Sequence, residues 1–121
     1  MLDAKAAARI ESSNEERRGN PRAALIVQVE CKRGSEYILG RSHDVSEGGL
    51  SVLTPETFEP GTEVVVRFNL PPYPPGIPLE SRGMIVRVRP GEQMGIQFLQ
   101  LGDRQREAIA RYVRQASERN I

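Results

Sequence analysis

The sequence predicts an all-β domain that ends in one C-terminal helix, with its strands closed into a six-stranded antiparallel β-barrel. Six short segments show the apolar–polar alternation of half-buried strands, and residues that favour turns separate them. The last segment changes to the longer period of an amphipathic helix. Because the pattern has no βαβ alternation and a closed barrel leaves no strand edge unprotected, a barrel is favoured over an open or parallel sheet.

Length and composition are those of one small globular domain. A chain of 121 residues can bury a single hydrophobic core. Aromatic residues make up only 5% of it and tryptophan is absent, so we expect a core of aliphatic side chains. The 17 basic and 16 acidic residues give a net charge of +1, which argues against a surface that coats DNA or RNA. A small anionic ligand needs only a local positive cluster.

A flexible or weakly helical leader is expected over residues 1–14, before a domain that covers 15–119. Leu2, Ala6 and Ile10 recur every four residues, and this thin apolar stripe is too weak to hold a helix alone. The alternative is a helix that docks on the barrel or on a partner. The start has no signal-peptide pattern and no stretch is long enough to span a membrane, so we expect a cytoplasmic protein without membrane insertion.

The first three strands belong to a barrel expected over about residues 22–99. A strand that begins near Arg22 is joined by a tight turn to a second strand over 36–43, and the pair reads as a hairpin. A short third strand follows the Asp44 turn. The regularly spaced apolar residues are Leu25, Val27, Val29 and Cys31 in the first strand, Tyr37 and Leu39 in the second, and Leu50 and Val52 in the third.

The other three strands surround a proline-rich segment, Pro71–Pro78, which is expected to be a stiff loop because proline interrupts both helices and strand ladders. A docking site at Tyr73 is the alternative for this loop. A turn at Pro90–Gly91 makes the last two strands a second hairpin. The regularly spaced apolar residues are Val64, Val66, Phe68 and Leu70 before the loop, then Met84, Val86 and Val88, which alternate with Ile85, Arg87 and Arg89, and then Met94, Ile96 and Phe98.

The C-terminal helix is expected over about residues 103–118, with Asp103 as its N-cap. Its apolar stripe is expected to pack on the barrel and consists of Ile109, Tyr112, Val113 and Ala116. Glutamates interrupt the arginines of the opposite face, so we interpret that face as solvated and not as a nucleic-acid contact. The arginines are Arg104, Arg106, Arg111, Arg114 and Arg119.

Two polar motifs lie on either side of the first hairpin. The downstream one is Asp-x-Ser-x-x-Gly, with Asp44 and Ser46 on one face of an extended segment and Gly48–Gly49 as a main chain without side-chain obstruction. The upstream one is Arg-x-x-x-Arg, at Arg18 and Arg22. Each motif is weak by itself, and the information lies in their pairing across about twenty residues.

In these motifs the chain resembles the PilZ domain family, over about residues 15–118. The resemblance implies the same six-stranded barrel and a receptor for the bacterial second messenger cyclic di-GMP, of the kind that serves motility, exopolysaccharide synthesis in biofilms, and development. The ligand-binding residues it implies are Arg17, Arg18, Arg22, Asp44, Ser46, Gly48 and Gly49, with Asn20 and Arg87 as further candidates.

The residue types suit such a ligand. A guanidinium can fork onto a guanine edge, grip a phosphate or stack on a purine, and an ionised Asp44 can accept the N–H groups of guanine. Ser46 and the backbone near Gly48 suit a phosphate oxygen. We expect repulsion among Arg17, Arg18 and Arg22 to keep their segment mobile until two ligand phosphates remove that repulsion. The segment then folds over the barrel, a change that a protein partner reads. The alternative is a PilZ-type adaptor that binds proteins without nucleotide.

An enzyme, a metal site and a resident cofactor are not expected. The single cysteine, Cys31, reads as a small buried hydrophobe, and with one histidine the chain lacks a zinc cluster. His43 precedes Asp44, but neighbours on a strand face opposite ways, so the two are not expected to form the His–Asp bond of a catalytic triad.

Overall fold

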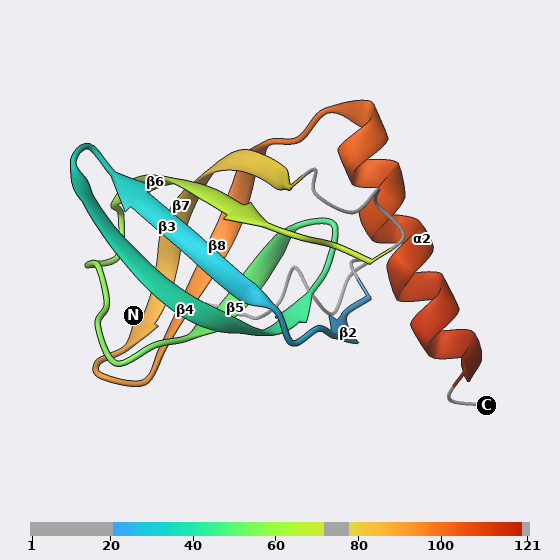
Figure 1. The fold of residues 1–121 in the computed structure, drawn as a ribbon, viewed down its shortest axis with the longest axis horizontal. Helices are drawn as coiled ribbons and strands as arrows, with labels where there is room; N and C mark the ends of the chain where they lie inside the picture. The colour runs from blue at the N-terminus through green and yellow to red at the C-terminus, as the bar shows by residue number, and fades with distance from the viewer. Residues whose placement is uncertain (1–20, 72–77, 120–121) are drawn as a thin grey trace.

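The computed structural model describes residues 21–71 and 78–119, and within them it contains seven strands and one helix (Figure 1). In chain order these are β2 (Ala23–Ala24), β3 (Gln28–Arg33), β4 (Glu36–Val45), β5 (Gly49–Leu53), β6 (Glu63–Phe68), β7 (Leu79–Arg89), β8 (Gln93–Gln100) and α2 (Asp103–Arg119). The predicted leader 1–14, the residues Arg17, Arg18 and Asn20, and the loop interior at 72–77 with Tyr73 lie outside the described residues.

The strands close into a barrel. Every pairing is antiparallel, the order along the sheet is β2-β4-β3-β6-β7-β8-β5, and an additional pairing of β4 with β5 closes the six strands from β4 to β5 into a ring. Six strands therefore make the ring, and the short β2 is added outside it along the end of β4. The prediction of a six-stranded antiparallel barrel with a C-terminal helix is confirmed.

The barrel interior is filled by aliphatic side chains, as the alternation predicts. Val29, Cys31, Val52 and Met94 have no exposed surface. Tyr37 and Leu39 share the outer side of β4 and remain 57% and 49% exposed. Inward side chains from strands on opposite sides of the ring pack together and form one contiguous core. The fully buried side chains include Leu50, Leu70, Leu79, Ile85, Val29, Val45, Val64 and Val66.

The predicted apolar face of β7 is wrong. Ile85 is fully buried, whereas Val86, which was grouped with Met84 and Val88, is 46% exposed. The inward face of β7 before the bulge consists of Leu79, Ser81, Gly83 and Ile85, so Val86 points outward. Ile85 pairs with Ile96 and Arg87 pairs with Gly95, so Val86 is the extra residue of a β-bulge, and the shift by one lets Val88 pack against the core.

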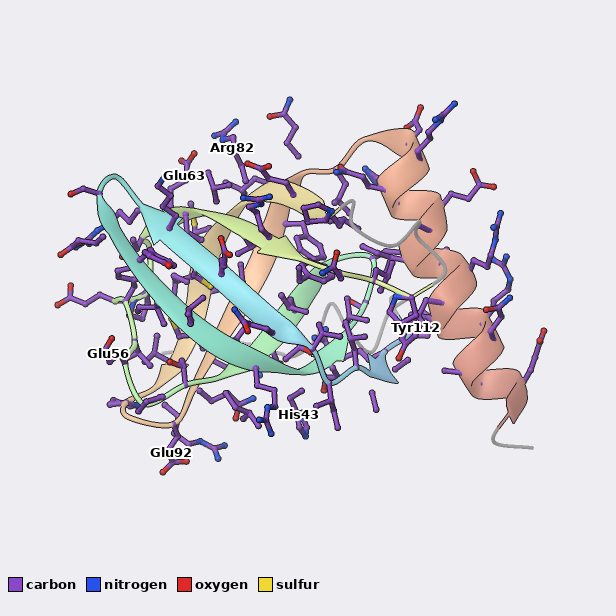
Figure 2. All side chains as sticks on the ribbon, viewed as in Figure 1. His43, Glu56, Glu63, Arg82, Glu92 and Tyr112 are labelled. Carbon is purple, nitrogen blue, oxygen red and sulfur yellow. The ribbon has the colours of Figure 1, made fainter. Side chains whose placement is uncertain are left out.

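The helix α2 lies across the end of the barrel at which β2 is found (Figure 1). Ile109 and Val113 are buried against the core, and the Tyr112 hydroxyl donates to the Ala24 carbonyl at 2.6 Å (Figure 2). The N-cap is Gly102 and not Asp103 as predicted. The Gly102 carbonyl accepts the first helical bond, from Arg106 at 2.9 Å, and its N–H donates to the Gln105 side chain at 2.9 Å.

Burial makes Cys31 a weak acid, which gives a testable dependence of stability on pH. Desolvation raises the pKa of its thiol from 9.0 to about 12. Between these values the folded state binds more protons than the unfolded state, so the free energy of unfolding falls as pH rises above about 9, by at most ~1.4 kcal/mol per pH unit. Urea unfolding at pH 8 and pH 10 should show the parent losing stability relative to Cys31→Val, which keeps the buried volume and cannot ionise. A constant difference would contradict the assignment.

Candidate functional site

A tight turn after β4 forms one wall of the site. The Ser46 N–H donates to the Gly49 carbonyl at 2.9 Å, and the Ser46 hydroxyl accepts the N–H groups of Gly48 at 3.1 Å and Gly49 at 3.2 Å. The Phe98 N–H of β8 donates to the Gly48 carbonyl at 2.9 Å. Ser46 is 1% exposed. Its hydroxyl therefore sets the shape of the turn from inside.

Arg22 connects the two sequence motifs directly. Its Nε and Nη2 donate to Asp44 Oδ1 at 2.9 and 2.7 Å, and its Nη1 donates to Ser46 Oγ at 3.2 Å. These partners are 22 and 24 residues away in the chain. The pairing of β2 with the end of β4 brings them together, because Ala23, the residue after Arg22, pairs with Val45, and Ala24 pairs with Asp44. The side chains of Arg22 and Asp44 are 23% and 25% exposed, so the pair lies at the surface but is partly shielded from water.

The motif glycines have a structural task that the sequence did not indicate. A Cβ on Gly49 would lie 2.3 Å from the Ile96 carbonyl oxygen, because β5 and β8 approach closely where Gly49 pairs with Gln97. The N–H groups of Gly48 and Gly49, expected to face an anion, donate to Ser46. These two glycines thus serve strand packing and the turn.

His43 departs from its predicted position. Its Nδ1 lies 3.3 Å from Asp44 Oδ2, so the expectation that neighbours on the strand must face apart is wrong. Ser42 pairs with Val52 and Asp44 pairs with Ser51, which leaves His43 as the extra residue of a bulge. The bulge interrupts the alternation and turns the imidazole toward the carboxylate.

Arg87 is placed on the same transverse row as Asp44. Asp44 pairs with Ser51, Ser51 with Gly95, and Gly95 with Arg87, which is exposed on β7. The ring order is β4-β5-β8-β7-β6-β3, so β7 lies three places from β4 and on the opposite side of the six-stranded barrel. Arg87 is therefore separated from Asp44 by half of the ring, and the structure does not bring it together with Arg22, Asp44 and Ser46.

Within residues 21–71 and 78–119, no three His, Cys, Asp or Glu side chains gather closely enough to hold a metal ion. Nor does any helix there have the length and hydropathy that a membrane crossing requires.

Comparison with known proteins identifies the family. The sequence model described as "PilZ domain" matches residues 16–115. The chain therefore belongs to the PilZ domain family, whose members are ligand-binding receptor domains and not enzymes. No curated protein matches the sequence.

Solved structures share the fold at low sequence identity. The Bacillus subtilis inhibitor of motility MotI/DgrA superposes with a TM-score of 0.75 at 17% identity, covering 84% of this chain and 52% of that one. The PilZ domain of CeSA from a cellulose-synthesizing bacterium gives 0.59 at 24%, covering 79% and 97%. The PilZ domain of Escherichia coli YcgR, solved with c-di-GMP, gives 0.65 at 15%, covering 86% and 94%. This chain spans about half the length of MotI/DgrA and of whole YcgR.

Proposed function

We propose that this protein is a cyclic di-GMP receptor whose site is built around Arg22, Asp44 and Ser46. The observation that carries the proposal is the direct hydrogen bonding of Arg22 to both other residues, which unites the two motifs at one surface. Membership of the PilZ domain family supports it, as does the similarity to a YcgR domain solved with this nucleotide.

The geometry suits recognition of a guanine or a phosphate. Asp44 and Ser46 together hold the guanidinium plane of Arg22 in one orientation. A planar cation so held can fork onto a phosphate or the O6/N7 edge of guanine, or stack on a purine. Because the side chain is already ordered, less conformational entropy is lost when ligand binds. In this proposal Ser46 contributes by orienting Arg22 and by shaping the turn.

The N-terminal arginines complete the site in this proposal. Arg17 and Arg18 precede Arg22, and two ligand phosphates would remove the repulsion among these arginines and fold their segment over the barrel. Asn20 lies in the same segment, and Arg87 is the candidate at the far end of the row. Arg22 adjoins β2, which is bonded to α2 through Tyr112, so a change at Arg22 has a short route to the helix. A protein partner would read the ordered segment.

Calorimetric titration with cyclic di-GMP tests the function. We expect binding by the parent and binding roughly ten- to a hundredfold weaker by Arg18→Ala, the effect of one charged forked contact. Cyclic di-AMP is the control ligand, because adenine lacks the O6 acceptor that an arginine fork reads. A binder of the folded state must also raise the melting midpoint. No heat and no melting shift with cyclic di-GMP would reject the receptor and favour the nucleotide-independent adaptor.

A further inference from the structure

His43 lies next to the site but outside both motifs. It occupies a bulge in β4, and its side chain is 60% exposed (Figure 2). Its Nδ1 lies 3.3 Å from Asp44 Oδ2, whereas the Arg22 fork uses Oδ1 of the same carboxylate. Oδ1 of Asp44 thus accepts from Arg22, and Oδ2 faces the imidazole of His43.

This arrangement limits the motion of the carboxylate. Rotation of the Asp44 carboxylate about its last bond would break the Oδ1 hydrogen bonds from Arg22 and move Oδ2 away from His43. With Arg22 alone, the carboxylate could swing and carry the guanidinium with it. An imidazole donates from Nδ1 both as the neutral Nδ1–H tautomer and as the imidazolium, so the contact does not require a charged ring. A partner of this kind orients the groups that touch the ligand.

We propose that His43 is a positioning residue for ligand recognition. Its Nδ1–H holds Asp44, and through Asp44 it holds the Arg22 guanidinium in the orientation that receives the ligand. This role rests on the proposed cyclic di-GMP site. It predicts that the hydrogen bond from Nδ1 carries the effect and that the rest of the ring does not.

Three substitutions separate the bond from the ring. Asparagine places an N–H donor near the position of Nδ1, glutamine places its donor near Nε2, and alanine has none. We expect His43→Ala and His43→Gln to weaken cyclic di-GMP binding by roughly three- to tenfold, because the Arg22 side chain is then no longer held before binding and must be ordered when the ligand binds. We expect His43→Asn to bind like the parent. Tyr37→Ala, an exposed ring at the other end of β4, is the matched control and should bind normally. Melting curves should show all four variants folded.

Either of two results would overturn the role: parent-like binding by His43→Ala, or binding by His43→Asn as weak as that of His43→Ala. The second result would mean that the imidazole ring, and not the Nδ1 donor, supports cyclic di-GMP binding.

A second measurement needs no ligand. His43 is the single histidine of the chain, so imidazole ¹⁵N spectra report on it alone. At alkaline pH we expect the Nδ1–H tautomer in the parent and a shift toward Nε2–H in Asp44→Ala. A parent in the Nε2–H form would reject the His43 proposal even if cyclic di-GMP binds. A parent that binds no cyclic di-GMP would instead reject the proposed function, so the two failures are distinguishable.

Discussion

Replacing Arg22 by alanine is expected to weaken cyclic di-GMP binding roughly ten- to a hundredfold, which corresponds to ~1.5–3 kcal/mol for a charged hydrogen-bonded contact. The guanidinium joins Asp44 and Ser46, so alanine removes the group that unites the motifs and leaves a carboxylate near the ligand phosphates. Arg22→Lys should be nearly as weak, because an ammonium keeps the charge but cannot fork. Calorimetric titration of both variants measures the effect.

Arg82→Ala is the matched control for Arg22. Arg82 also pairs with a carboxylate, its Nη2 lying 2.6 Å from Glu63 Oε2, but this pair joins β6 to β7 away from the site (Figure 2). Its side chain is 52% exposed, so its loss should change stability by less than about 1 kcal/mol and leave affinity unchanged. Equal losses of affinity in Arg22→Ala and Arg82→Ala would mean that general positive charge, and not the assigned site, attracts the nucleotide.

Replacing Gly49 by alanine is expected to destabilise the whole barrel by ~1–3 kcal/mol and to lower the melting midpoint by roughly 5–15 °C. The added Cβ would lie 2.3 Å from the Ile96 carbonyl oxygen, and a backbone atom in a sheet cannot move aside as a side-chain end can. β5 must then retreat from β8, which also displaces the turn that carries Ser46. Thermal unfolding measures the first effect, and cyclic di-GMP titration of the folded fraction measures the second.

Gly95→Ala is the control for Gly49 on the facing strand. There the nearest atom to a new Cβ is the Arg87 Cβ at 3.3 Å, which can shift by a few tenths of an ångström. Alanine also removes the entropic penalty of glycine in a strand, so little change in stability is expected. If Gly49→Ala melts like Gly95→Ala, the close approach of β5 to β8 is not what this glycine serves.

Much of the barrel was predictable from local pattern. The alternation of Val64, Val66 and Phe68 and of Met94, Ile96 and Phe98 matches buried positions in β6 and β8, because one side of a barrel strand always faces the core. The buried stripe of α2 at Ile109 and Val113 followed from its period in the same way. These are properties of a single element and its two sides.

The errors occur where a contact between elements changes a local rule. The bulges at His43 and Val86 depend on how β4 and β7 register with their neighbours, and a sequence read one strand at a time contains no register. The N-cap at Gly102 depends on a bond from Gln105, where the acidic Asp103 seemed the better candidate. In each case the local sequence was compatible with both the predicted and the observed arrangement.

The sequence by itself determined the family, the barrel, the helix and the two motifs, since these follow from periodicity and from residue types at fixed spacing. Only the tertiary structure decided what the motif residues do. It joins Arg22 to Asp44 and Ser46, assigns Gly49 to the packing of β5 on β8, and brings His43 to the second oxygen of Asp44. The physical reason is that these hydrogen bonds and close contacts depend on strand pairing and register, which a linear pattern does not encode.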